Sequence, residues 1–547
     1  MRYNGRFRYR LCAVKHFQLS EAKVIEMWER FASKSKVLAT SATSKSKVLA
    51  TSATSESKVS ATSATSESKV SATSATSESK VLATLATKLL TALHTYPPQQ
   101  MVLADMKLKV SLLPDTATWA FLALLATWPA VLRADNWPQW RGPNGDGISA
   151  AKSTATTWSS SQNVAWRTPM PGQGGATPAI WGDTMFVTSA DGDELVLLCM
   201  DTASGDVRWQ RTVTSGNQDA RAGEGNSASP SPCTDGQHVW VFFSTGVLAC
   251  YDFDGTEKWK FDVGERFGKL EIQFGMTSTP LLVGEHLYLQ LIHGVMRKDD
   301  DTRSGQVIKL DKLSGDTVWV HERLTQAQFE CKHSYASPVL YDDGQRQFVI
   351  AHGADATTGH SLETGEELWR LAGLNGPSDI NSSYDDTFRF VASPAVSPGW
   401  IIVPTAKAGP TVALQVNDQL QGDVSRNPAV VKWHLNGTPD VSIPLIVDDL
   451  VYLLHKDGKL QCVELETGEE LYHNRTHTVQ HRTSPVYAGG HIYFCGKDGV
   501  CTVVKAGRQF EIVSENDMDG ESITASPVVT DGTLYLRTYA AVYAIKK

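Results

Sequence analysis

A group of charged, amide and imidazole side chains recurs a few residues before a repeated proline in this 547-residue chain. Carboxylates, guanidinium groups and imidazoles can bind a polar ligand or a peptide through salt bridges and hydrogen bonds. If the segments that follow the prolines converge, these side chains meet around one opening. The alternative is that they only satisfy loop backbones and bound water. The candidate binding residues are Glu224, Asn226, Gln273, His333, Arg389, His481, Arg482 and Glu521.

The signatures of common catalytic machinery are missing from the sequence. There is no P-loop, no G-x-S-x-G elbow, no H-E-x-x-H pair and no kinase catalytic loop. The run Asp299-Asp300-Asp301 could attract calcium, but it lacks the spaced carboxylates of a calcium loop and is typical of a solvated hairpin tip. We therefore assign no catalytic residue and no metal ligand.

The cysteines also favour a structural interpretation. Seven of the eight follow residue 134, an odd number, and none forms a C-x-x-C pair. Cys199, Cys462 and Cys501 each stand six residues before a turn glycine, and Cys250 has the same place in a shorter turn. We interpret these four as small buried core residues rather than as disulfide or zinc partners. Equivalent positions in neighbouring repeats are also expected to lie too far apart for a bridge.

The element that must position the candidate residues is a repeated sheet. A small residue, a proline and an apolar run recur eight times, at intervals of 41 to 58 residues. Each phrase is followed by two more apolar runs with Gly or Asp turns between them. The phrases are Thr177-Pro178, Ser229-Pro230, Thr279-Pro280, Ser337-Pro338, Ser393-Pro394, Ile443-Pro444, Ser484-Pro485 and Ser526-Pro527.

Five repeats then carry a turn glycine with an aromatic residue four positions later: Gly205/Trp209, Gly255/Trp259, Gly315/Trp319, Gly365/Trp369 and Gly468/Tyr472. Proline is tolerated at the start of a strand, and glycine supplies the positive φ of a tight hairpin. The large aromatic face cannot be buried by one sheet, so Trp166, Trp209, Trp259, Trp319, Trp369 and Tyr472 are expected to dock between neighbouring sheets.

These features predict an all-β fold, an eight-bladed β-propeller of four-stranded antiparallel blades over residues 161–547. The last repeat stops at Lys547 after about three strands. Residues 163–167 can supply its outer strand, so we expect the N- and C-terminal strands to pair and close the ring.

The first 134 residues do not share the repeat pattern of the propeller. Residues 33–87 are five copies of an 11-residue Ser/Thr-rich unit, so 1–105 is expected to be disordered or a wrongly assigned start. Residues 106–134 have two lysines, an uncharged apolar stretch and a small residue at the end, which predicts a secretory signal peptide. A leader at 135–160 then precedes the propeller.

Charge and hydropathy exclude two other classes. Residues 1–134 hold 18 basic and 8 acidic side chains, which leaves 33 basic and 51 acidic in the rest of the chain. A body with a net charge of −18 argues against nucleic-acid binding, which needs a basic surface. No apolar run of 18 residues follows residue 134, so no transmembrane helix is expected there.

The Pro-headed strand, the A-x-D-x-x-T-G-E-x-x-W turn and the eightfold count resemble the PQQ-like (quinoprotein-like) propeller repeat, over residues 160–547. Segments 135–149 and 158–174 also resemble secreted PQQ-like proteins of planctomycete-type bacteria. Blade 5 departs from the pattern, because it has Trp433 without a T-G turn, and blade 7 keeps Gly507 without its aromatic residue.

The resemblance implies two kinds of function. Quinoprotein dehydrogenases bind pyrroloquinoline quinone (PQQ) with calcium, and commonly have a disulfide between adjacent cysteines; this chain has no Cys-Cys pair and no C-x-x-C-H haem site. BamB-like propellers are scaffolds and need no cofactor. We therefore predict an exported, non-catalytic binding or scaffolding propeller of the cell envelope, periplasmic or secreted, whose partner is an envelope protein or a small polar ligand. The alternatives are a PQQ- and calcium-dependent oxidoreductase and a carbohydrate- or peptide-binding propeller.

Overall fold

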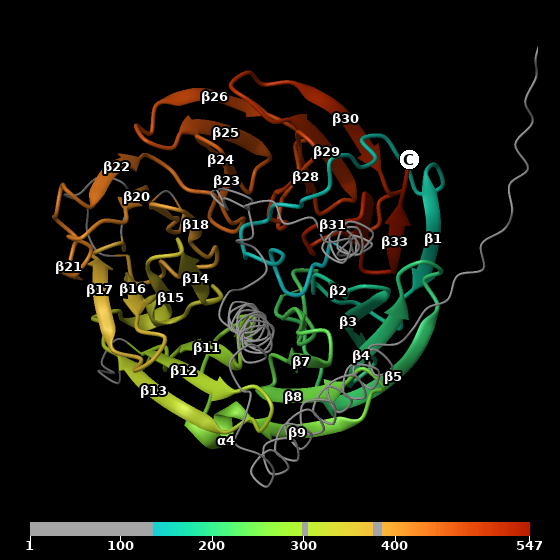
Figure 1. Cartoon of the computed structure of the whole chain (residues 1–547), viewed down its shortest axis with the longest axis horizontal. Helices are drawn as coiled ribbons and strands as arrows, with labels where there is room; N and C mark the ends of the chain where they lie inside the picture. Colours follow the sequence, from blue (N-terminus) through green and yellow to red (C-terminus); the bar gives the residue numbers. More distant parts are fainter. Residues whose placement is uncertain (1–134, 222, 298–304, 376–384, 408) are drawn as a thin grey trace, which may run out of the picture. The chain divides into compact units, whose positions relative to one another are not determined.

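The computed structural model describes residues 135–547, except 222, 298–304, 376–384 and 408. These residues form eight sheets arranged as a ring, which confirms the predicted eight-bladed β-propeller (Figure 1). The repeats of residues 1–105, the predicted signal peptide at 106–134 and Asp299–Asp301 lie outside the described residues. No helix in the described part of the chain is long and apolar enough to cross a membrane.

Blades 1 to 4 follow one another along the chain, each from its innermost to its outermost strand. Blade 1 consists of β2 (Ala179–Trp181), β3 (Thr184–Asp191), β4 (Glu194–Asp201) and β5 (Val207–Ser215), and blade 2 of β6 (Cys233–Thr234), β7 (His238–Phe242), β8 (Val247–Asp252) and β9 (Glu257–Asp262). Blade 3 consists of β10 (Leu281–Val283), β11 (His286–Ile292), β12 (Gly305–Asp311) and β13 (Thr317–Arg323), and blade 4 of β14 (Val339–Asp342), β15 (Gln347–Gly353), β16 (Ala356–His360) and β17 (Glu367–Ala372). The short helices α4 (Val263–Phe267) and η2 (Phe329–Lys332) lie in loops between blades.

Blades 5 to 7 repeat this order, and blade 8 combines the two ends of the described chain. Blade 5 consists of β18 (Ala395–Ser397), β19 (Trp400–Val403), β20 (Thr411–Gln415) and β22 (Val431–Leu435), and blade 6 of β23 (Leu445–Val447), β24 (Leu450–Leu454), β25 (Lys459–Glu464) and β26 (Glu470–Arg475). Blade 7 consists of β27 (Val486–Ala488), β28 (His491–Cys495), β29 (Val500–Lys505) and β30 (Ile512–Asp517), and blade 8 of β31 (Val528–Thr530), β32 (Thr533–Arg537), β33 (Ala541–Ile545) and β1 (Val164–Pro169). The antiparallel pairing of β1 with β33 confirms the predicted closure of the ring.

The core lies between the faces of neighbouring blades. Middle strands such as β3 are buried on both faces, whereas the outer strand β1 alternates between partly buried and exposed positions. Between blades 1 and 2, the ring of Phe186 contacts Trp209 and Phe253, with centroids 6.0 and 4.9 Å apart. Each blade therefore buries most of its apolar surface against its neighbours, as expected of a repeat architecture, and the leader covers part of the rest.

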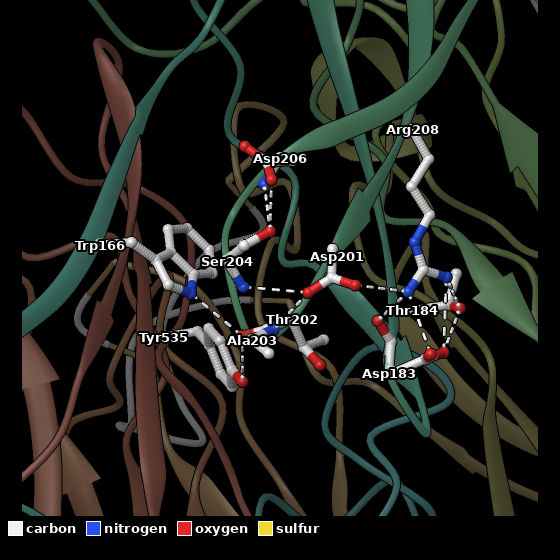
Figure 2. Close-up of polar contacts among 10 residues, drawn as sticks. All are labelled: Trp166, Asp183, Thr184, Asp201, Thr202, Ala203, Ser204, Asp206, Arg208 and Tyr535. Atoms are coloured by element: carbon white, nitrogen blue, oxygen red, sulfur yellow. Dashed lines mark hydrogen bonds and ion pairs between the residues drawn. The ribbon is translucent and has the colours of Figure 1, made fainter.

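The outer tryptophan of one blade packs on the hairpin turn of the next. Trp166 of blade 8 donates from Nε1 to the carbonyl oxygen of Thr202 in the first turn, at 3.0 Å (Figure 2). In the same turn, the carboxylate of Asp201 accepts hydrogen bonds from the backbone N–H groups of Ala203 and Ser204, and Arg208 binds its other oxygen at 2.7 Å.

The turn glycine is required because the indole ring leaves no room for a side chain. At Gly205 φ is +79°, and an added Cβ would lie 2.6 Å from the ring of Trp166. The same contact joins blades 1 to 2, 2 to 3, 3 to 4 and 5 to 6, through Trp209 on Gly255, Trp259 on Gly315, Trp319 on Gly365 and Trp433 on Gly468.

Blade 5 lacks the glycine turn, so the tryptophan of blade 4 has no turn in the next blade to pack on. Trp369 joins the core between blades 4 and 5, but its ring lies over Gly359 of its own blade. The connection between β20 and β22 instead reaches blade 4, where β21 (Gly422–Asp423) adds a parallel fifth strand beside β17. Tyr472 packs against Phe510 of blade 7, with ring centroids 5.5 Å apart.

A belt of hydrogen bonds joins the innermost strands just before their prolines. The backbone N–H of Thr279 donates to the hydroxyl of Ser337 at 2.9 Å, and the N–H of Ser337 donates to Ser393 at 2.8 Å. Seven such links are present. Blade 6 has Ile443 in this place, which cannot accept a hydrogen bond. The belt holds the starts of the inner strands at one level.

The belt shows that the repeat phrase predicted for blade 2 was placed two residues too early. In blade 2 the hydroxyl that accepts from Thr177 belongs to Ser231, and Ser231 in turn donates to Thr279. The repeat phrase of this blade is therefore Ser231-Pro232, not Ser229-Pro230. The two phrases are adjacent in the sequence, and only the pairing between blades distinguishes them.

We expect Ser337→Ala to lower the free energy of unfolding by about 1–3 kcal/mol, because the buried N–H of Thr279 would lose its acceptor. The measurement is the urea midpoint, with the exposed Ser161→Ala as the matched control. Equal midpoints for the two variants would mean that the belt does not stabilise the ring.

The leader lies against the other ends of the inner strands. Trp137, which is 1% exposed, forms an antiparallel bridge with Ile180 of β2. The carbonyl oxygen of Pro138 accepts from the N–H of Thr234 in blade 2, and the side chain of Gln139 accepts from blade 3. One short segment thus contacts three blades in succession.

The leader then reaches the opposite side of the ring through a buried arginine. The guanidinium group of Arg141 donates to the carbonyl oxygens of Pro485 and Pro444, at 2.5 and 3.4 Å, in blades 7 and 6. Ile148 pairs with Tyr487 of β27. The leader therefore contacts inner strands on both sides of the ring, in blades 1 to 3 and in blades 6 and 7.

Candidate functional site

A cavity lies at the opposite end of the inner strands, just beyond the belt. Its volume is about 250 Å³. Every blade contributes at least one residue, because the loop that enters each innermost strand reaches the same opening. We call it the mouth cavity; its lining is Gly175, Ala220, Arg221, Glu224, Ser229, Phe274, Thr277, Tyr335, Arg389, Val391, Val441, Arg482 and Thr524.

One side of the mouth cavity is an aromatic ring, Phe274, that two guanidinium groups contact. The guanidinium carbon of Arg221 lies 5.5 Å from the ring centroid of Phe274, and that of Arg389 lies 5.2 Å from it. Tyr335 is the next aromatic neighbour, with its ring centroid 6.1 Å from that of Phe274. Both arginines lie within the range of a cation–π attraction, which fixes their positions on the ring.

The opposite side holds a carboxylate bound by two cations. Glu224 accepts from Arg482 at 2.6 Å and lies 3.2 Å from the ammonium group of Lys497. Burial by itself would raise the pKa of Glu224, but the two cations outweigh it and hold the pKa below its usual value. Glu224 is therefore an ionised anchor that ties the loop before blade 2 to blade 7.

Three of the eight predicted binding residues line the mouth cavity, namely Glu224, Arg389 and Arg482. Gln273 is exposed beside Phe274 and is not part of the lining. Glu521 instead accepts hydrogen bonds from Arg167 and Tyr543, at 2.8 and 2.9 Å.

The remaining three predicted residues are buried in structural hydrogen bonds. The amide of Asn226 donates to the carbonyl oxygen of Gln173 at 3.0 Å. His333 bonds the carbonyl oxygen of Gly294, and His481 bonds that of Val479. Burial lowers the pKa of both imidazoles, that of His481 to about 4, so both rings are neutral at physiological pH.

Sequence reasoning missed Arg221, Phe274 and Tyr335. Arg221 and Phe274 stand in the long loops before blades 2 and 3, which have no periodic pattern to fix the direction of a side chain. Tyr335 stands three residues before Pro338, at a repeat position that marks it only once the inner strands are aligned.

The donor set of the mouth cavity does not fit the calcium and PQQ pair of the quinoprotein pattern. Calcium takes six to eight oxygen ligands, usually with several carboxylates. The lining contains one carboxylate, Glu224, and its two oxygens are bound by Arg482 and Lys497. Within the described ranges, no three His, Cys, Asp or Glu side chains are grouped as a metal site would require.

A disulfide joins Cys495 and Cys501, which corrects the interpretation of Cys501 as a free core residue. The two cysteines face each other on neighbouring strands of the same blade, β28 and β29, with Cα atoms 3.9 Å apart. Equivalent positions in different blades are too far apart for a bridge, whereas these two cysteines belong to one hairpin. Cys199, Cys250 and Cys462 are buried and free, as predicted.

The disulfide closes the hairpin loop that carries Lys497 to Glu224. We expect replacement of both cysteines by alanine to lower the free energy of unfolding by about 2 kcal/mol, the chain-entropy value for so short a loop. The measurement is the urea midpoint, with Cys462→Ala as a control for removing a buried sulfur. If addition of reductant leaves the wild-type midpoint unchanged, the bridge does not constrain the unfolded chain.

Sequence and structure comparisons agree with this geometry. The chain matches the family described as outer membrane protein assembly factor BamB over residues 148–230, 214–470 and 344–547. A search of curated proteins finds no match. Among solved structures, BamB from Moraxella catarrhalis is 17% identical, with a TM-score of 0.50, and the match covers 70% of this chain and 99% of that one.

Two quinoprotein enzymes share the fold as well. A europium-containing methanol dehydrogenase is 12% identical, with a TM-score of 0.54, over 75% of this chain and 90% of its own. The quinohemoprotein alcohol dehydrogenase from Comamonas testosteroni is 12% identical, with a TM-score of 0.53, over 75% and 80%. At these identities, the structural similarity establishes the propeller only. The sequence match spans most of the described chain, and the protein therefore belongs to the family of outer membrane protein assembly factor BamB.

Proposed function

We propose that this protein is an exported, non-catalytic binding propeller of the cell envelope, and that the mouth cavity holds a polar group of its partner. The observation that carries the proposal is the construction of the cavity: loops from all eight blades converge on it, with guanidinium and aromatic groups on its wall. Such a convergence of a few polar groups in an apolar recess is typical of a ligand site.

Two features favour binding over catalysis. The charged groups Glu224, Arg482 and Arg389 are already held in ion pairs, so they are preorganised to hold a ligand in place. The two imidazoles that the sequence suggested for the mouth are engaged with backbone carbonyls. The BamB family name supports a role beside an envelope protein.

The location in the envelope is supported by the disulfide and by the packing of the leader that follows the predicted signal peptide. Disulfides persist in oxidising compartments such as the periplasm. Asp135, the residue after the predicted signal peptide, donates its backbone N–H to the carboxylate of Asp531 at 3.1 Å, and the leader that follows pairs with the inner strands of blades 1 and 7. We expect the mature protein to begin at Asp135, which intact-mass measurement of the exported chain tests. A product that retains residues 106–134 would contradict the export signal.

Site-specific photo-crosslinking in living cells tests the binding role. A crosslinking residue at Thr277, in the mouth cavity, is expected to capture a discrete envelope polypeptide. The control position is the exposed Leu313, in the hairpin turn between β12 and β13. Equal capture from both positions, or none from Thr277, would contradict the proposal.

Calorimetric titration with PQQ tests the oxidoreductase alternative on the same protein. We expect no calcium-dependent binding heat, since the one lining carboxylate is bound to cations. Micromolar, calcium-dependent PQQ binding would overturn the scaffold role and lead to assays of alcohol or sugar oxidation.

A further inference from the structure

The wall of the mouth cavity carries more positive than negative charge. Three guanidinium groups line it, and Lys497 stands behind Glu224. Among the described residues, the acidic groups beside them are Glu224, Glu330, which is paired with Arg389, and Asp219, which like Glu224 raises the pKa of Tyr539. In the described part of the chain, four cations therefore stand beside three carboxylates, on a body whose net charge is strongly negative. This local excess is directed at the cavity.

Of the positively charged groups on the wall, Arg221 is the one whose charge is most accessible to a ligand. It is exposed, and none of the ion pairs within the described ranges includes it. Its contact with Phe274 leaves the N–H groups at the edge of the guanidinium plane free for an acceptor. A guanidinium group presents parallel N–H donors that match the two oxygens of a carboxylate.

Besides these four cations, Arg141 of the leader lies among the starts of the inner strands. Arg141 donates to the carbonyl oxygens of Pro485 and Pro444, which belong to the starts of the inner strands of blades 7 and 6. Burial lowers its pKa to about 10, which keeps it protonated at neutral pH. Its hydrogen bonds go to backbone carbonyl oxygens, and the nearby carboxylate of Asp146 attracts it without an ion pair among the described residues. Arg141 therefore keeps a positive charge among the starts of the inner strands, whose entering loops form the mouth cavity.

We propose that the mouth cavity recognises a carboxylate borne on a short apolar stem, as in an acidic segment of a partner protein. Arg221 and Arg389, which both lie over the ring of Phe274, bind the oxygens. Val391, Val441 and the ring of Phe274 contact the methylene groups. This inference rests on the proposed function and specifies the chemistry of the ligand.

The test compares two acetylated, amidated heptapeptides that differ only in two central residues, Glu in one and Gln in the other, with glutarate as a small carboxylate. Binding to the purified exported chain is measured by calorimetry at low salt. We expect the Glu peptide to bind at least tenfold more tightly than the Gln peptide, and to weaken as salt is raised.

Variants locate the binding. Arg221→Gln is expected to weaken the Glu peptide at least fivefold, and because Arg221 is exposed the fold should tolerate the change. The matched control is Arg508→Gln, which removes the same charge from the turn between β29 and β30, where Arg508 pairs with Glu464 and Asp449. Equal weakening by both variants would mean unspecific attraction and would overturn the proposal.

The outcomes separate this inference from the proposed function. If both peptides bind equally and photo-crosslinking from Thr277 succeeds, the cavity is a binding site but the carboxylate inference is wrong. If neither peptide nor glutarate binds, the inference is overturned, and the crosslinking result decides the proposed function separately. Glutarate binding as tightly as the Glu peptide supports the carboxylate and assigns it to a small molecule. Inorganic phosphate binding more tightly than either would overturn it.

Discussion

Replacement of Arg141 by alanine is expected to lower the free energy of unfolding by about 3–5 kcal/mol. The guanidinium group is 3% exposed and donates to three backbone carbonyl oxygens, two of them in different blades. Its removal leaves those buried acceptors unpaired and opens a cavity between the inner strands. It also frees the leader, because Gly147 packs directly on the guanidinium group.

The measurement is chemical denaturation followed by tryptophan fluorescence. Lys152→Ala is the control, since Lys152 belongs to the same leader but is exposed. Arg141→Lys should recover only part of the loss, because an ammonium group cannot reach several carbonyls in fixed directions. A midpoint for Arg141→Ala as high as that of Lys152→Ala would show that the leader does not stabilise the ring.

Replacement of Trp259 by alanine is expected to cost about 3–5 kcal/mol as well. The indole ring packs on Gly315 of the next blade, stacks on Phe261 with centroids 5.6 Å apart, and donates to Lys312 at 3.1 Å. The reason for the large effect is that blades are held mainly by their neighbours, so the loss of one contact between blades weakens the whole ring. Val207→Ala, on the exposed side of β5, is the control.

A double-mutant cycle sharpens this prediction. Gly315→Ala is expected to destabilise the native protein because an added Cβ would lie 2.9 Å from the indole ring, at a φ of +73°. In the Trp259→Ala background the clash is gone and only the backbone strain remains, so Gly315→Ala should cost less there. Strict additivity of the two changes would mean that the ring and the turn do not act as one contact.

The sequence determined the number of blades and the closure of the ring, because both follow from local signals that recur. In each blade a proline marks the start of the inner strand and, in most cases, a glycine and an aromatic residue mark the outer hairpin. The last repeat was one strand short and residues 163–167 carried the spare one, so the pairing of β1 with β33 was the one solution without an open edge. The departures at blade 5 were also visible as a missing turn.

The tertiary structure decided the contacts between residues with no common pattern. The pairing of Arg141 with Pro485 and of Cys495 with Cys501 depends on distances across the ring or across a hairpin, which residue types alone do not give. The side chains of Arg221 and Phe274 meet because two irregular loops fold over the same opening. Regular strands fix the direction of a side chain by alternation, whereas a loop fixes it only by packing, and the candidate site is built from loops.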